Sequence, residues 1–168
     1  MYFEGVADTR WLDEQEQHTW QTFMVAIRLL IHRLEEDLDH KAGIPPTYYE
    51  LLALLSGAPD GTLRMSELAS RALSKPSRIS HAVNRLEQAG WIRREHCAAD
   101  RRGWLAVLTD KGRAILEVAA PEHAESVRAH LIDLLTREQV TQLGEISEIL
   151  LNHLKPASGG STAETHTP

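Results

Sequence analysis

Apolar residues recur every three or four positions in two long stretches, one near each end of the chain. In residues 10–39 this spacing predicts a helix, and its apolar face is formed by Trp20, Phe23, Ile27, Leu30, Leu34 and Leu38. Gly43 and the Pro45–Pro46 pair are expected to end this helix. A last helix is predicted to follow "TREQ" (136–139), a capping-box sequence, and its apolar face is formed by Val140, Leu143, Ile146, Leu150 and Leu154.

Shorter elements divide the chain between these two helices. The stretch "TYYELLALLSG" predicts a helix that opens with a capping box of Thr47 and Glu50. After a break rich in Gly and Pro, "TLR" (62–64) predicts a short extended segment. Ser66 is then the expected N-cap of the short helix "ELASRAL".

A second helix and a hairpin follow. Ser74 is the expected N-cap of the second helix, which has Pro76 in its first turn and ends at Gly90. The segments "WIRREH" and "WLAVLT" predict two strands joined by "CAADRRG". Thr109 is expected to begin a further helix that extends to about residue 135 and bends at Pro121.

The order of a short helix, a turn, a second helix and a hairpin is that of a winged helix-turn-helix. We therefore predict a mostly α fold with a small β-hairpin wing, in which residues 46–116 form the winged lobe. Residues 10–45 and 117–154 form dimerisation helices, since their apolar faces exceed what so small a lobe needs. The alternative is that these helices pack only on each other within one monomer. The Gly/Ser/Thr/Pro-rich residues 155–168 predict a disordered tail.

Charge is distributed unevenly along the chain. The formal net charge is −6, with 18 basic and 24 acidic residues. Residues 61–113 nevertheless carry 11 basic and 5 acidic residues, a net charge of +6, whereas the remainder carries −12. A basic lobe on an acidic body is the charge distribution of a protein that meets a polyanion.

Composition argues against several classes of protein. Apolar runs fall short of the roughly 20 residues that cross a bilayer, and the acidic N-terminus lacks a signal-like apolar region. With a single cysteine, Cys97, these features predict a cytoplasmic protein without a membrane partner. The Gly-rich phosphate loop, HExxH and GxSxG motifs are missing, so we expect no enzyme and no cofactor. The nine histidines lack ligand spacing, and we expect no metal site.

The second helix has two chemically different faces. On a helical wheel, Ile79, Ala82, Val83, Leu86 and Ala89 collect on one side. The opposite side carries hydroxyl, amide, imidazole and guanidinium groups, which are the groups that read base edges in the major groove. The candidate DNA-binding residues of this helix are Lys75, Ser77, Arg78, Ser80, His81, Asn84 and Arg85. Lys75 and Arg85 are expected nearer phosphate than bases.

The string "RLEQAGWIRRE", the "DRR" of the hairpin and "LTDKG" resemble the MarR (multiple antibiotic resistance) family of transcription regulators. This resemblance covers about residues 10–154. It implies a homodimer that presents two winged lobes to a palindromic site in double-stranded DNA. It also implies that a wing arginine enters the minor groove while Asp100 orients the wing, and either Arg101 or Arg102 would serve.

The resemblance further implies a repressor relieved by a small molecule bound between the dimerisation helices and the lobe. Candidate residues for such an effector pocket are His18, Trp20, His32, Tyr48 and Tyr49. Some relatives sense oxidants through cysteine, but Cys97 lies at the wing, where an inert, packed thiol is the favoured interpretation. Alternative functions are a winged-helix adaptor that binds protein and a PadR-type regulator.

Overall fold

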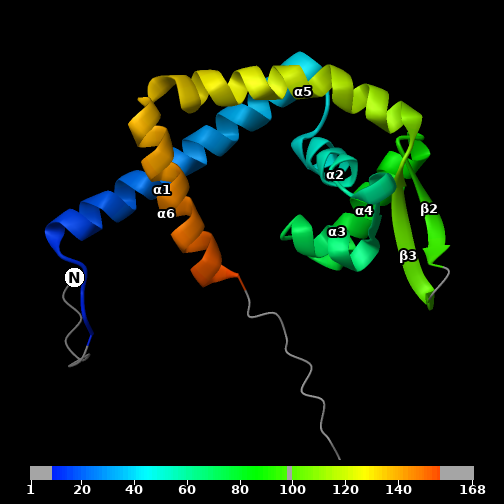
Figure 1. The fold of residues 1–168 in the computed structure, drawn as a ribbon, viewed down its shortest axis with the longest axis horizontal. Helices are drawn as coiled ribbons and strands as arrows, with labels where there is room; N and C mark the ends of the chain where they lie inside the picture. The colour runs from blue at the N-terminus through cyan, green and yellow to red at the C-terminus, as the bar shows by residue number, and fades with distance from the viewer. Residues whose placement is uncertain (1–8, 98–99, 156–168) are drawn as a thin grey trace, which may run out of the picture.

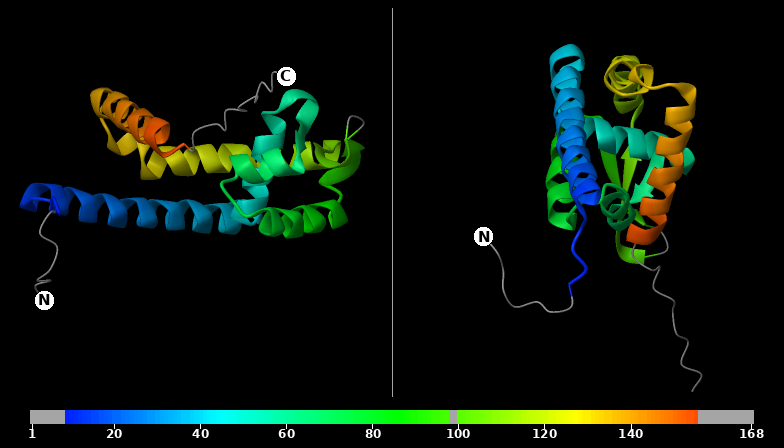
Figure 2. Two further views of the ribbon diagram at one scale, coloured as in Figure 1. Left: turned by 90° about the horizontal axis from the view of Figure 1, so that it is seen from below. Right: turned by 90° about the vertical axis from the view of Figure 1, so that its left-hand side faces the viewer.

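The computed structural model describes residues 9–97 and 100–155, and for residues 100–102 it describes the backbone alone. Helix α1 (Glu14–Asp37) runs along helix α5 (Asp110–His130) in the opposite direction (Figures 1 and 2). The winged lobe lies at one end of the α1–α5 pair. Helix α6 (Arg137–Leu154) folds back from the other end of α5. The prediction of a mostly helical winged fold is confirmed.

The lobe consists of α2 (Pro46–Ser56), α3 (Met65–Arg71), α4 (Pro76–Gln88) and a three-stranded antiparallel sheet. Its core is formed by fully buried side chains from each helix and from the sheet: Leu51, Leu52, Leu55, Leu68, Ile79, Val83, Leu86 and Ile92. Burial of each such side chain contributes about 1.5–3 kcal/mol. The apolar face predicted for the second helix is the face that α4 turns to this core.

The sheet has the order β1–β3–β2, where β1 is Thr62–Arg64, β2 is Ile92–Cys97 and β3 is Asp100–Leu108. The predicted extended segment 62–64 is therefore a third strand, paired with β3. The predicted seven-residue connection between the hairpin strands is wrong. Residues 100–103 already belong to β3, because a register irregularity after His96 lets Asp100 pair with Cys97.

Sequence reasoning placed some helix termini correctly. The capping box of Thr136 and Gln139 is present, and the Thr109 side chain accepts a hydrogen bond from the Gly112 N–H. Gly90 has φ 76° and follows the last residues of α4, where its left-handed backbone closes the helix as predicted. Helix α5 is shorter than predicted, because a 3₁₀ turn (Ile132–Leu134) replaces its last turn.

Three predicted caps are wrong. Helix α2 starts at Pro46, so Thr47 lies inside its first turn and caps nothing. Strand β1 leads directly into α3, which places Ser66 within the helix and Arg64 at the N-cap. Helix α4 starts at Pro76 with Lys75 at the N-cap, one residue after Ser74. Proline suits the first helical position because the missing N–H would be unpaired there in any case, and in α2 and α4 this preference outweighs the capping residues.

The turn between α3 and α4 contains a strained residue. Leu73 has φ 46°, in the left-handed region that glycine usually occupies, and its side chain is 92% exposed. The Leu73 and Ser74 N–H groups donate to the carbonyls of Ser70 and Ala69, which completes a Schellman motif. The tight turn between α3 and α4 therefore forms at the cost of an unfavourable backbone conformation at Leu73.

A polar cluster joins α1 to α5 beside the lobe. Asp37 Oδ2 accepts hydrogen bonds from Ser126 Oγ at 2.6 Å and from His130 Nε2 at 3.0 Å, and Lys41 Nζ lies 3.5 Å away. The Ser126 hydrogen bond is the main reason that the pKa of Asp37 falls from its usual 3.8 to about 2. Helix α1 continues beyond Asp37 as a π-helical turn (Leu38–Ala42) that ends at Gly43, in agreement with the predicted stop.

Candidate nucleic-acid interface

Helix α4 presents the polar face predicted for it. The side chains of Lys75, Ser77, Arg78, His81 and Arg85 are exposed. Ser80 and Asn84 are half-buried, and within the described part of the chain the buried Asn84 Oδ1 has no hydrogen-bond partner. The structure therefore gathers these predicted residues on one accessible surface.

An ion pair fixes α4 against the hairpin. Arg94 on β2 donates to Glu87 Oε2 through Nη2 at 2.6 Å and through Nε at 2.9 Å, and its backbone N–H donates to Glu87 Oε1 at 3.1 Å. The Arg94 side chain lowers the pKa of Glu87 below its ordinary value, although burial opposes this shift. Because Glu87 lies in the last turn of α4, the pair sets the angle between this helix and the wing. Sequence reasoning counted Arg94 only as a basic residue.

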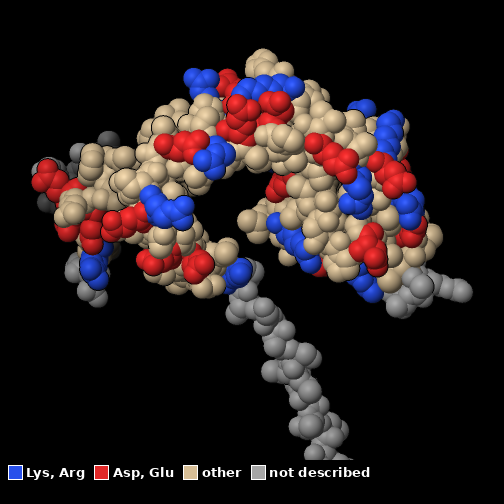
Figure 3. All heavy atoms as spheres, turned by 45° about the horizontal axis from the view of Figure 1, so that its top comes forward, with Lys and Arg blue, Asp and Glu red and all other residues tan. Residues whose placement is uncertain are grey.

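Other arginines of the basic segment are also paired. Arg71 contacts Glu67 at 2.6 Å, and Arg93 contacts Glu95 at the same distance. Figure 3 shows basic and acidic side chains next to each other on the visible face of the lobe. Net charge in the sequence therefore overstates the positive charge that the lobe can offer a polyanion, and the exposed cations of α4 become the main contribution from the described side chains.

The wing is described in part. Asp100, Arg101 and Arg102 form the first residues of β3, but their side chains lie outside the described part of the structure, so their assignment stays a prediction. Next to these residues in the hairpin, the rings of His96 on β2 and Trp104 on β3 pack with their centroids 3.9 Å apart. Sequence reasoning missed this pair, although the register of a hairpin places the two residues opposite each other.

Cys97 is buried, at 9% exposure, in the last position of β2. Its Sγ accepts a hydrogen bond from Arg64 Nη2 at 3.3 Å. A buried thiol is poorly accessible to oxidants. This placement favours the packing interpretation of Cys97 over the redox one.

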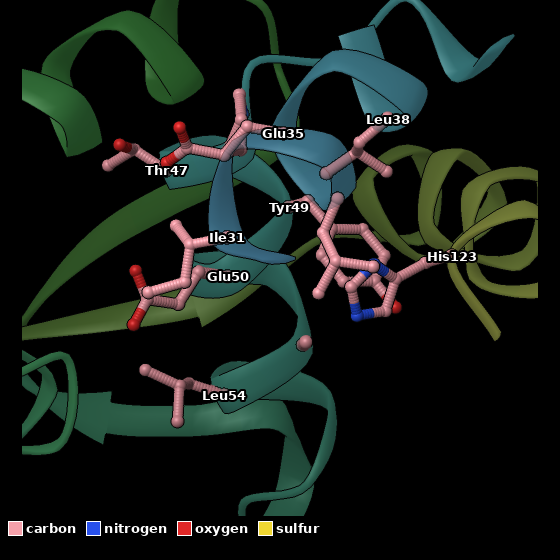
Figure 4. Close-up of a pocket in the computed structure, with 11 residues that line it drawn as sticks. Ile31, Glu35, Leu38, Thr47, Tyr49, Glu50, Leu54 and His123 are labelled. Carbon is pink, nitrogen blue, oxygen red and sulfur yellow. The ribbon is translucent and has the colours of Figure 1, made fainter. Parts of the chain in front are cut away.

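A second candidate site is an open cavity of about 400 Å³ between α1, α2 and α5 (Figure 4). We call it the α1–α2–α5 cavity, and its lining residues are Ile31, Leu34, Glu35, Leu38, Pro46, Thr47, Tyr49, Glu50, Ala53, Leu54 and His123. The rings of Tyr49 and His123 lie with centroids 4.7 Å apart. His123 Nδ1 is buried and has no hydrogen-bond partner among the described residues.

Burial dominates the protonation of the polar groups in this cavity. It raises the pKa of Tyr49 and of Glu50 and lowers the pKa of His123. The positive charge of Arg78 on α4 partly opposes the shift at Glu50. The charge of Arg78, on the candidate DNA-binding face, therefore acts on one carboxylate of the cavity, that of Glu50.

The structure brings only one of the predicted pocket residues into this cavity. Tyr49 lines it, whereas His32 lines two neighbouring hollows. Tyr48 packs against the core, and His18 and Trp20 are exposed on the far part of α1. These four residues do not line the cavity, because the spacing of residues along one helix does not determine which neighbouring helix they meet. Their role in an effector site stays a prediction.

Glu35, Glu50 and His123 line the cavity but were not predicted from the sequence. His123 is far from α2 in the chain and reaches Tyr49 only through the packing of α5. Among the described residues, none of the helices is long and apolar enough to cross a membrane, and acidic, His and Cys side chains form no cluster suited to a metal.

Comparison with known proteins agrees with this geometry. The family model of the MarR family matches residues 42–103. The chain is 30% identical over 133 residues to the HTH-type transcriptional regulator PecS of Dickeya dadantii (strain 3937), covering 76% of this chain and 79% of PecS. It is 34% identical over 107 residues to the HTH-type transcriptional repressor MdtR of Bacillus subtilis (strain 168), covering 64% of this chain and 67% of MdtR.

Among solved structures, Sco3205 is a MarR family transcriptional regulator from Streptomyces coelicolor, crystallised in complex with DNA. It superposes on this chain with a TM-score of 0.84 and 45% sequence identity. The match covers 90% of this chain and 95% of Sco3205, so the likeness includes the long helices as well as the lobe.

Proposed function

The chain belongs to the MarR family, and from this premise we propose that it regulates transcription by binding DNA as a homodimer. The observation that carries the proposal is the exposed polar face of α4, held beside a wing in a chain 45% identical to a regulator crystallised with DNA. MdtR is named a repressor, and we extend that role to this chain. Such a regulator acts in the cytoplasm and needs no catalytic activity or cofactor of its own.

Helix α4 enters the major groove in this proposal. Arg78 reads guanine, because its guanidinium matches the O6 and N7 acceptors. Ser77, Ser80, His81 and Asn84 lie near base edges, whereas Lys75 and Arg85 bind phosphates. On the wing, Arg101 or Arg102 enters the minor groove and Asp100 orients it.

The homodimer forms through residues 10–45 and 117–154. Large apolar side chains of α1 and α6 are exposed in the single chain: Trp20, Phe23, Ile27, Ile146, Ile149, Leu150 and Leu154. Exposed apolar area on this scale indicates an interface, since monomers rarely leave such a surface in water. Sedimentation at micromolar concentration is expected to give twice the mass of the 18.9 kDa chain, and a monomer would contradict the proposal.

The α1–α2–α5 cavity is the proposed effector site. It lies where the long helices meet the lobe, and its volume of about 400 Å³ is within the range of small-molecule pockets. A ligand there relieves repression by changing how the lobe sits on the long helices.

Titration of the chain against its own promoter region, at several salt concentrations, tests DNA binding. Lys75, Arg85 and the wing arginine that stays outside the minor groove, in each of two lobes, would neutralise six phosphates, so log affinity should fall with log salt at a slope of about −5. A flat response would favour an adaptor that binds protein. The absence of a shift at micromolar protein would refute the proposal.

Two sets of variants separate positioning from sequence reading. Arg78→Ala should cost about 1–3 kcal/mol at the best site and narrow the difference between sites. Arg101→Ala combined with Arg102→Ala should weaken binding to every sequence and leave the dimer intact. Normal binding by the double variant would show that the wing assignment is wrong.

A further inference from the structure

The α1–α2–α5 cavity is apolar on its walls and acidic at one side. Two exposed glutamates, Glu35 and Glu50, line it beside the aliphatic residues, and none of its eleven described lining residues is Lys or Arg. In Figure 4 both carboxylates point to one side of the cavity, and the rings of Tyr49 and His123 lie on the other. A molecule that fits this arrangement has an apolar body and a charged end.

The neighbouring surface carries further carboxylates, although one of them, Glu36, is paired with Arg33 at 3.1 Å. A neighbouring hollow shares Glu35 with the cavity and adds Glu36 and Asp39, and its other ionisable lining residues are His32 and His40. Two glutamates that face a cavity disfavour an anionic occupant and attract a cationic one. The aromatic face of Tyr49 offers a further favourable contact to a cation.

We propose that the ligand of the α1–α2–α5 cavity is a cationic amphipath, whose apolar or aromatic body fills the cavity and whose ammonium group is held by Glu35 and Glu50. This inference rests on the proposed role of the cavity as an effector site. It specifies the chemical class of the effector and makes anionic molecules of similar shape the disfavoured class.

Arg78 also acts on Glu50 through its charge, from the candidate DNA-binding face of α4. A cationic ligand and Arg78 therefore compete for Glu50, and occupation of the cavity changes the electrostatic surroundings of a residue proposed to read guanine. Coupling of this kind is reciprocal, so a change at Arg78 must alter the affinity for the ligand.

Calorimetry with three probes of matched shape tests the ligand class in the absence of DNA. The probes are 4-phenylbutylamine, 4-phenylbutanol and 4-phenylbutanoate, which carry a positive, neutral and negative end. We expect the amine to bind most tightly and the butanoate least. Butanoate binding equal to or tighter than amine binding would overturn the proposal, as would no amine binding up to millimolar concentration.

Variants of single glutamates locate the cation. Glu35→Gln and Glu50→Gln should each weaken amine binding about fivefold, as for partly exposed ion pairs, and leave binding of the alcohol unchanged. Glu125→Gln removes a carboxylate from α5 that does not line the cavity, and it should leave both affinities unchanged. Arg78→Ala should tighten amine binding about twofold, because Glu50 then loses its competing cation. Equal affinities in all four variants would overturn the proposal, once circular dichroism shows that each is folded.

The outcome of this experiment is independent of DNA binding. A protein that binds promoter DNA but prefers the butanoate refutes the ligand class alone. A protein that prefers the amine but binds no DNA refutes the proposed regulator and leaves the ligand class supported.

Discussion

The Glu87–Arg94 pair allows a quantitative test of how α4 is held against the wing. We consider Arg94→Met, which keeps the length of the side chain and removes both of its hydrogen bonds to Glu87 Oε2. Charge-assisted hydrogen bonds contribute about 1.5–3 kcal/mol when well shielded. Here the two side chains are 31% and 36% exposed, and screening by solvent reduces the expected total to about 1–2 kcal/mol.

Thermal and urea unfolding measure this loss. For a chain of this size a loss of 1–2 kcal/mol corresponds to a decrease in Tm of about 3–6 °C. Arg93→Met is the matched control, since Arg93 and Glu95 form a neighbouring pair that is 56% and 46% exposed. The control should cost less than about 0.5 kcal/mol.

The stability that the Glu87–Arg94 pair contributes should depend on pH. The folded state lowers the pKa of Glu87, chiefly through Arg94. A carboxylate with a depressed pKa stabilises the fold above its unfolded value of about 4.5 and loses that contribution as the pH falls through the folded pKa. The difference in unfolding free energy between the parent and Arg94→Met should therefore be complete at pH 7 and shrink as the pH falls below about 4.5. Equal losses for Arg94→Met and Arg93→Met, or a difference that does not change with pH, would refute the reasoning.

Three further substitutions, two of them with a comparison variant, test other parts of the fold. Asp37→Asn removes a carboxylate whose pKa is about 2, so it should destabilise the chain at pH 7 and have less effect as the pH falls from about 4 to 2; an acid titration followed by fluorescence checks this. Leu73→Gly should stabilise the chain by up to about 1 kcal/mol, since φ 46° costs leucine more than the extra chain entropy costs glycine, whereas Leu73→Val should destabilise it in urea unfolding. Gly112→Ala should destabilise by at least about 2 kcal/mol in the same assay, because an added Cβ would overlap the Trp91 carbonyl oxygen. Gly57→Ala is its control, with an ordinary contact of 3.7 Å, and should change stability by less than about 1 kcal/mol.

Periodicity predicted the helices and the core face of α4 well, because the burial of Ile79, Val83 and Leu86 depends on a spacing that any winged lobe must satisfy. Helix starts were less predictable. Thr47 follows Pro46 directly, and Ser74 lies two residues before Pro76. In each case the proline can itself take the first helical position, and local sequence does not decide between it and the capping residue.

The exposed polar face of α4 could be predicted from the sequence and the cavity could not, for a physical reason. Residues on one helix face are related by their spacing, so Arg78 and His81 are placed together by the sequence of α4 alone. Tyr49 and His123 belong to helices far apart in the chain and meet only because α5 packs on α2. Pairing within the basic segment was also hidden, since the distance from Glu87 to Arg94 depends on the turn between α4 and β2.

Helix α2 connects α4 with the α1–α2–α5 cavity, because one of its faces packs in the lobe core and the other lines the cavity. Leu51, Leu52 and Leu55 are fully buried in the lobe core that also holds the apolar face of α4. Tyr49, Glu50 and the residues one turn later line the α1–α2–α5 cavity on the other face. A close-packed core transmits a shift of one helix to its neighbours, because it contains little empty volume to absorb the movement. In the proposed mechanism, a ligand that moves α2 against α1 also moves α4, so the lobe responds to the cavity without direct contact between ligand and DNA.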